Sequence, residues 1–193
     1  MEKTGMGASI GVDIKKAKGE RNGKIGVRSI WETTITDKDG NIKSFSRDEN
    51  LVTNQGLAAL LDVMFMGGDQ ITDWYVLLTD GSGDSPTTSS TYAVPIFTEM
   101  SDITNAKRPV FTGVQTLGSI TNNASKAVFT IDATSVTDLL GGALVGALTG
   151  ADVIGNVAAS NAILYCAIDF AELKSIVATD VVSIAITMTA TGY

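Results

Sequence analysis

The chain has 193 residues, of which 44% are hydrophobic, 6% aromatic and 18% charged, with a formal net charge of −7 and no histidine. This length and apolar content suit one globular domain with an appendage and exclude wholesale disorder. Without histidine, a hydrolase built on a Ser-His-Asp or Cys-His arrangement is excluded within this chain, and the commonest zinc ligand is missing.

Charge is distributed unevenly along the chain. Residues 1–28 contain seven basic and three acidic residues, and residues 29–193 contain seven basic and eighteen acidic residues. The first segment therefore carries +4 and the remainder −11, in agreement with the formal −7. Because residues 1–25 are also rich in irregularly spaced glycine, we expect a basic N-terminal arm over 1–25 and an acidic folded body over 26–193. The arm lacks the apolar core of a secretory signal.

Residues 27–46, "VRSIWETTITDKDGNIKSFS", are typical of a β-hairpin. Apolar and β-branched residues flank Asp39-Gly40, a pair that favours a tight turn. The letters "DKDGN" also occur in calcium loops, but an EF-hand register would put Ile42 where glycine is needed and Asp48 where glutamate is needed. The segment therefore predicts a plain turn.

The stretch "NLVTNQGLAALLDVMF" at 50–65 predicts a short amphipathic helix over about 55–66. Thr53 or Asn54 is placed to cap its start, and Gly67-Gly68 is typical of a helix end. The i, i+3, i+4, i+7 spacing predicts one buried stripe, formed by Leu57, Leu60, Leu61 and Met64. Burial of each side chain contributes roughly 1.5–3 kcal/mol, so the stripe would fix the helix on a sheet. The opposite, solvent-facing side is formed by Gln55, Ala58, Ala59 and Asp62.

The rest of the chain is typical of short strands separated by turns. Residues 71–79 predict an apolar strand with Trp74 and Tyr75 on opposite faces, and residues 80–92 predict a long loop. Residues 94–100 predict a short edge strand, and residues 139–150 a strand or a closely packed connection. Residues 162–170 predict a buried strand, and in residues 181–191 apolar residues alternate with small and polar ones. The fold class expected is mainly β, an antiparallel, jelly-roll-like β-sandwich with one short helix.

Few residues are candidates for catalysis or for binding a metal or a cofactor. Cys166 is either a nucleophile or a small buried hydrophobe, and its apolar neighbours favour the second interpretation. Asp80 and Asp84 are either a weak cation site or solvated loop carboxylates. The stretch "GMGASIG" at 5–11 is similar to a phosphate-binding loop, but its spacing is wrong and no strand precedes it. We therefore expect no catalytic residue, no cofactor, no metal site and no enzyme; hydrolysis by a carboxylate pair and DNA binding are weaker alternatives.

Several motifs resemble those of tailed-bacteriophage virion structural proteins. They begin at Trp31 and include "DGN" at 39–41, "NLVTNQGLAALLDVMFMGG" at 50–68 and "WYVLL" at 74–78. They continue with "RPVFT" at 108–112, "SITNNASKAVFTI" at 119–131, "ILYCAIDF" at 163–170 and "DVVSIAITMT" at 180–189. Leu77 stands where the pattern has glycine. The resemblance covers about 31–191 and rests on structural motifs.

The resemblance implies a capsid decoration (cement) protein that binds the outer capsid surface as an oligomer and stabilises the shell. Its partners would be the major capsid protein and further copies of itself, a trimer being preferred to a dimer, with no nucleic acid and no membrane. The protein would be made in the host cytoplasm and reside on the capsid exterior. The alternative is a tail-fibre or receptor-binding module that uses residues 80–92, with Tyr92, to grip a surface ligand.

On the decoration hypothesis the N-terminal arm contacts the capsid. Basic residues would supply attraction and interleaved apolar residues would supply buried area, because exposed ion pairs contribute little by themselves. The alternative for this segment is a solvated tail. The candidate contact residues are Ile10, Val12, Ile14, Lys15, Lys16, Lys18, Arg21 and Lys24.

Overall fold

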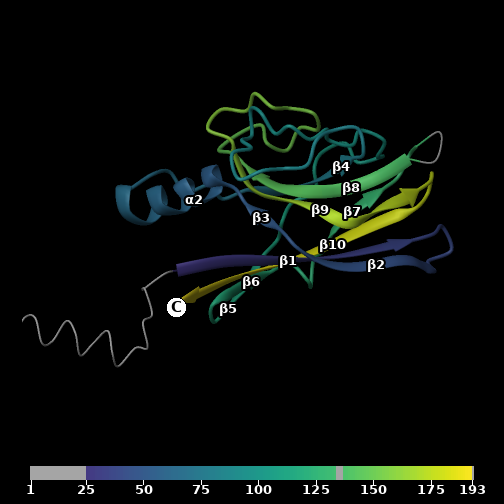
Figure 1. Ribbon diagram of the computed structural model, residues 1–193, viewed down its shortest axis with the longest axis horizontal. Helices are drawn as coiled ribbons and strands as arrows, with labels where there is room; N and C mark the ends of the chain where they lie inside the picture. Colours follow the sequence, from purple (N-terminus) through teal and green to yellow (C-terminus); the bar gives the residue numbers. More distant parts are fainter. Residues whose placement is uncertain (1–24, 134–136, 193) are drawn as a thin grey trace, which may run out of the picture.

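The computed structural model describes residues 25–133 and 137–192, which form a mainly β protein (Figure 1). Within these residues, one sheet contains β1 (Ile25–Thr36), β2 (Ile42–Glu49), β5 (Val114–Thr116), β6 (Ser119–Thr121), β7 (Ala127–Thr130) and β10 (Val181–Gly192). The other contains β3 (Leu51–Val52), β4 (Trp74–Asp80), β8 (Thr137–Gly146) and β9 (Ile163–Ile176). The orders are β2-β1-β10-β6-β5, with β7 also paired to β10, and β3-β9-β8-β4. The paired strands are antiparallel, which confirms the predicted β-sandwich.

The main core lies between the two sheets. Strand β10 contributes Val182, Ile184 and Ile186, which are buried, and Met188, which is partly buried against the same cluster. The predicted alternation in this strand is therefore confirmed. The largest side chain of the core is that of Trp31, which is fully buried on β1.

A second core lies on the outer face of the four-stranded sheet. It is built from Leu77, Val145 and Leu164 of the sheet together with Tyr92 and Phe97 of the loop that follows β4. This loop and the one between β8 and β9 cover the sheet from above (Figure 1). Because the four-stranded sheet is buried on both faces, its strand β8 has a nearly continuous buried run and no alternation.

The first hairpin has the predicted turn. The Asp37 carboxylate accepts hydrogen bonds from the backbone N–H of Asp39 and of Asn41, both at 2.9 Å, and Gly40 has a φ of 83°. Hydrogen bonding by Asn41 lowers the pKa of Asp37. The carboxylate is thus used to close the turn.

Two further strand predictions have different outcomes. Trp74 packs against the main core and Tyr75 against the second core, so their opposite orientation is confirmed. The predicted edge strand at 94–100 is wrong, because only an isolated bridge joins Glu99 to Thr79. Pro95 cannot donate to a ladder, and Ile96 has a φ of 65°, which is incompatible with an extended strand.

Candidate functional site

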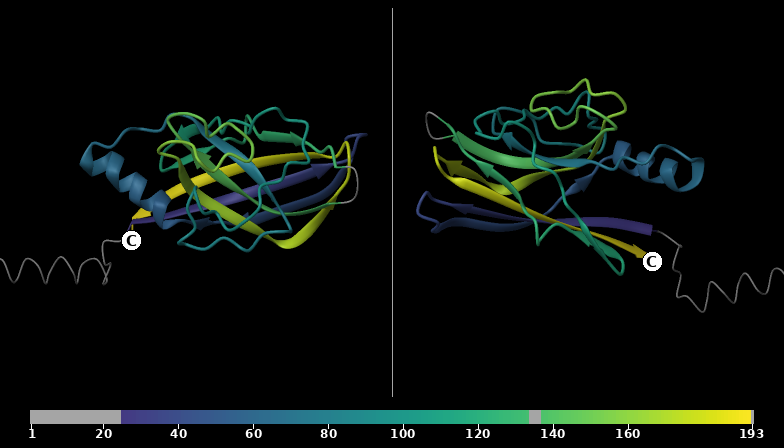
Figure 2. Two further views of the ribbon diagram at one scale, coloured as in Figure 1. Left: turned by 90° about the horizontal axis from the view of Figure 1, so that it is seen from above. Right: turned by 180° about the vertical axis from the view of Figure 1, so that it is seen from behind.

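A helical projection extends from one end of the sandwich (Figures 1 and 2). It consists of α2 (Asn54–Leu61), continued by the π-helical turn η1 (Asp62–Met66). The Thr53 side chain caps its start by accepting a hydrogen bond from the Gly56 N–H at 3.0 Å, and Gly67 ends it with a φ of 72°. The predicted helix, its cap and its glycine end are confirmed, and from here residues 54–66 are called the projection.

The first turn of α2 attaches the projection to strand β9. The Gln55 carboxamide oxygen accepts hydrogen bonds from the N–H groups of Tyr92 and Leu164, both at 2.9 Å, and its NH₂ group donates to the Ala162 carbonyl at 3.1 Å. Gly56 is buried so closely against β9 that a Cβ atom there would lie 2.4 Å from the Tyr165 carbonyl oxygen. The attachment therefore depends on polar contacts and on close backbone approach.

The apolar stripe of the helix is exposed, and the prediction that it is buried is wrong. The exposed fractions are 39% for Leu57, 37% for Leu60, 55% for Leu61 and 60% for Met64. The side expected to face solvent contains Gln55, which is instead the residue that anchors the helix. The four-stranded sheet, to which the helix is attached, already has both faces covered by other residues, so neither of its faces is available to the leucines.

The exposed apolar surface continues beyond the predicted stripe. Phe65 and Met66, in the π-helical turn, are 70% and 79% exposed. Every large apolar side chain from Leu57 to Met66 is in fact exposed. Exposed large apolar side chains that are grouped on one element mark an interaction surface more often than scattered ones do.

A groove of about 210 Å³ lies between the projection and the edge of the four-stranded sheet. Ala59, Leu60 and Val63 of the projection form one wall. Ile71, Trp74, Ile163 and Tyr165 supply apolar surface on the other side, and Asp62 and Asp69 are the charged residues that line it. From here this is called the helix groove.

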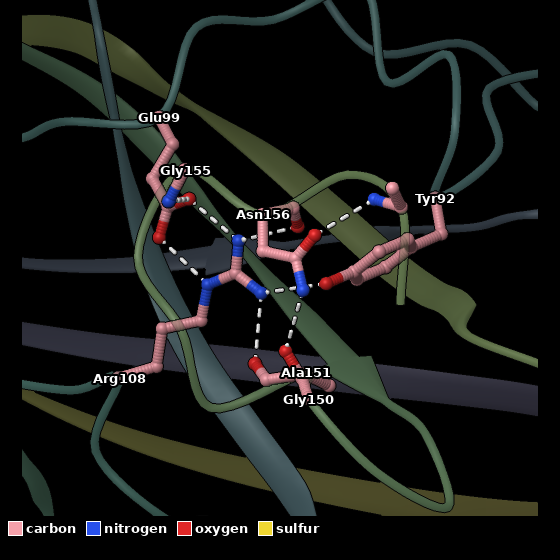
Figure 3. Close-up of polar contacts among 8 residues, drawn as sticks. Tyr92, Glu99, Arg108, Gly150, Ala151, Gly155 and Asn156 are labelled. Carbon is pink, nitrogen blue, oxygen red and sulfur yellow. Dashed lines mark hydrogen bonds and ion pairs between the residues drawn. The ribbon is translucent and has the colours of Figure 1, made fainter. Parts of the chain in front are cut away.

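The second notable cluster surrounds Arg108, whose side chain is almost completely buried (Figure 3). Its guanidinium makes a two-pronged ion pair with Glu99, with N–O distances of 2.7 and 2.6 Å. The remaining donors bond the Tyr92 hydroxyl at 3.0 Å, the Ala151 carbonyl at 2.8 Å and the Asn156 carbonyl at 3.2 Å. All five N–H bonds of a guanidinium are thereby used.

The Arg108 cluster joins the two long loops that cover the second core. Glu99 also accepts a hydrogen bond from the Gly155 N–H at 2.7 Å, so its carboxylate joins its own loop to the backbone of the other loop. Burial alone would lower the pKa of Arg108, but the hydrogen bonds and charge of Glu99 raise it. A cavity of about 290 Å³ adjoins the cluster. Because no donor of Arg108 is free, the cluster serves to hold the loops.

Two residues singled out from the sequence are buried. Tyr92 is 5% exposed and packs in the second core, so the expectation that it is free to grip a ligand is wrong. Cys166 is fully buried, and burial raises the pKa of its thiol to about 12. The interpretation of Cys166 as a small buried hydrophobe is confirmed, because a neutral, inaccessible thiol is a poor nucleophile.

Asp80 is used within its own loop, where its carboxylate accepts hydrogen bonds from the backbone N–H of Ser82 at 2.8 Å and from the Ser82 hydroxyl at 2.5 Å. Among residues 25–133 and 137–192, no three His, Cys, Asp or Glu side chains are grouped so as to hold a metal ion. No helix in this part of the chain is long and apolar enough to cross a membrane.

The predicted capsid-contact residues Ile10, Val12, Ile14, Lys15, Lys16, Lys18, Arg21 and Lys24 lie outside the described residues. Sequence reasoning missed Gln55, Phe65 and Arg108. Phe65 and Met66 could have been noticed as apolar residues beyond the predicted stripe. No local signal marks Arg108, whose partners are 9 to 48 residues away.

Comparisons with protein-family models, with curated proteins and with solved structures find no match to this chain.

Proposed function

We propose that this chain is a structural protein of a bacteriophage virion, which binds the outer surface of the capsid as an oligomer and stabilises the shell. On this proposal it acts by contact and transforms no substrate. The observation that carries the proposal is the projection, in which every large apolar side chain from Leu57 to Met66 is exposed at one end of the sandwich.

We expect apolar contact to contribute more to capsid binding than charge does. The described residues are strongly acidic, and their ion pairs at the surface, such as Arg28 with Glu49, are between exposed side chains. Such pairs contribute little to binding in water. Burial of apolar side chains such as Phe65 and Met66 against a partner would contribute more to binding than these ion pairs, because it removes apolar surface from water.

Oligomerisation would multiply a modest contact. If each copy presents one projection and one basic arm, several copies in one oligomer bind the shell together, and their combined affinity greatly exceeds that of a single copy. The arm residues from Ile10 to Lys24 stay predicted capsid contacts. An acidic body also keeps unbound copies apart in solution.

Labelling of virions with an antibody or gold conjugate against this chain tests the proposal. The expected result is regular labelling over the capsid exterior, with density for the protein in a cryo-EM map of the head. Labelling of the tail alone would favour a fibre or receptor-binding role, and virions without the protein would contradict a virion role altogether.

Deletion of residues 1–25 tests the contribution of the arm. We expect weaker binding of the shortened protein to capsids that lack it, measured by co-sedimentation. Undiminished binding would show that the arm is a solvated tail.

A further inference from the structure

We propose that residues 8–18 of the same chain bind in the helix groove and cover part of the projection. This intramolecular contact goes beyond the proposed function and does not depend on it. It follows from the chemistry of the groove, from the residues at 8–18, and from the place where the described part of the chain begins.

The helix groove selects an occupant that is apolar with positive charge. Its floor and walls are mostly apolar, including Leu60, Val63 and Trp74, so a purely polar segment would gain little there. Its charged residues are Asp62 and Asp69, and residues 48–106 contain no lysine or arginine at all. The negative charge at the groove is therefore not neutralised by neighbours in sequence.

Residues 8–18, "ASIGVDIKKAK", have this composition. Ile10, Val12 and Ile14 alternate with smaller or polar residues, so in extended backbone all three lie on one face. Lys15, Lys16 and Lys18 follow directly. One segment thus offers an apolar edge for the groove and cations for its carboxylates.

The start of the described chain lies close enough for this contact. The Ser29 carbonyl accepts a hydrogen bond from the Asn50 N–H at 3.3 Å, so Ile25 and the first residue of α2, Asn54, are each four residues from one contact. The start of β1 and the projection also lie at the same end of the sandwich (Figures 1 and 2). The eleven residue steps from Ile14 to Ile25 span up to about 37 Å when extended.

Attachment to the same chain favours the intramolecular contact over binding between copies. A short linker gives the segment an effective concentration in the millimolar range, which exceeds the protein concentration of a dilute solution. If the protein also binds a capsid, this segment would have to leave the groove before its lysines contact the shell.

Hydrogen–deuterium exchange on the full chain tests the inference. Amides of residues 8–18 should exchange more slowly than those of a free peptide of the same sequence, by roughly tenfold or more. The double variant Leu60→Glu, Val63→Glu changes two exposed groove residues and should remove this protection. The matched control is Leu57→Glu, Met64→Glu, on the same projection but not lining the groove, and it should keep the protection.

A charge variant separates the electrostatic part of the contact from its apolar part. Asp62→Asn with Asp69→Asn should reduce the protection several-fold, and more strongly at low salt, because the charges lie at the surface. The acrylamide quenching of Trp74 should rise in the Leu60→Glu, Val63→Glu variant, since the segment no longer covers its ring. Trp31 is fully buried and supplies a constant background.

Three outcomes would overturn the inference. Residues 8–18 could exchange at the free-peptide rate in the unmodified protein, or both double variants could behave alike. Protection that appears only as the mass rises with concentration would assign the groove to a neighbouring copy. None of these outcomes depends on capsid binding, so failure here is distinguishable from failure of the proposed function.

Discussion

The Arg108 cluster and the projection both involve segments attached to the four-stranded sheet, but they differ in which side chains are buried. Around Arg108, a buried charge is paired with Glu99 and every donor of the guanidinium has an acceptor. On the projection, the polar residue Gln55 faces inward and the large apolar residues face outward. The polar groups of the first region are paired, whereas the apolar side chains of the second region are exposed.

This difference indicates that the Arg108 cluster stabilises the fold and that the projection is better suited to a contact. A buried charge that lost one partner would destabilise the protein strongly, so the Arg108 cluster belongs to the fold. Exposed leucines contribute little to the fold, and exposed large apolar side chains grouped on one element are typical of a contact surface. Substitutions in the two regions should therefore have opposite signatures.

Loss of Arg108 should have the largest effect on stability. Arg108→Ala leaves the Glu99 carboxylate and the Tyr92 hydroxyl without their partner inside the loop layer, and we expect a loss of about 3–5 kcal/mol in the free energy of unfolding. Urea denaturation measures it. The neighbouring variant Lys107→Ala removes an ion pair between the exposed Lys107 and the partly buried Asp152, and it should change the unfolding curve much less. Equal effects of the two variants would contradict the assignment of the cluster to the fold.

Alkaline pH should weaken the fold through the main core. Burial raises the pKa of Cys166 from 9.0 to about 12 and the pKa of Tyr165 from 10.0 to about 12. The unfolded chain releases these protons first, so stability is complete below about pH 9 and falls between pH 9 and 12, by about 1.4 kcal/mol per pH unit for each titrating group.

Substitution of Cys166 isolates its contribution to this loss of stability at alkaline pH. Urea denaturation of Cys166→Ala at pH 8, 9.5 and 11 should show a shallower loss of stability than the unmodified protein. In the native state at pH 8 the thiol should also resist alkylation, whereas it should react after unfolding. Rapid alkylation of the native protein would show that the core is open to solvent.

Substitution of Gly56 should act on the attachment of the projection. In Gly56→Ala the new methyl group would lie 2.4 Å from the Tyr165 carbonyl oxygen, so helix and strand must separate. We expect a loss of about 1–3 kcal/mol, partly offset by the higher helix propensity of alanine. Thermal unfolding measures it, and Gly67→Asn is the control, because open space surrounds Gly67 and asparagine tolerates positive φ. A greater loss from Gly67→Asn would show that the helix end, and not its first turn, holds the projection.

The exposed leucines should have the smallest effect on folding. Leu61→Ser and Phe65→Ser should each change the free energy of unfolding by no more than about 0.5 kcal/mol, as is usual for surface positions. The control is Leu144→Ala in the main core, which should cost about 2–5 kcal/mol. If Leu61→Ser or Phe65→Ser lost as much free energy of unfolding as Leu144→Ala, the apolar stripe would be covered in the isolated protein.

The sequence was sufficient for features that depend on local pattern. The alternation in β10, the Asp39-Gly40 turn, the Thr53 cap and the Gly67 helix end were all predicted from neighbouring residues. The helix period also identified the stripe, but a period shows only which residues share a face. It does not show whether a sheet is left to cover that face.

Features that depend on distant contacts could not be predicted. The second core arises because two long loops fold over the four-stranded sheet, and their position is fixed by Arg108 through partners far along the chain. Because those loops cover the sheet, the apolar stripe of the helix does not pack on it. The inward position of Gln55 follows from hydrogen bonds to Tyr92 and Leu164 that no local pattern predicts.

Binding of a projection variant to capsids that lack this protein tests whether the projection is the surface that contacts the shell. The variant Leu61→Ser, Phe65→Ser, Met66→Ser should keep the secondary structure and unfolding curve of the unmodified protein. It should bind the shell at least about tenfold more weakly, because its apolar contact area is lost. If the folded variant binds as tightly as the unmodified protein, the projection is not the contact surface, which would contradict the proposed function.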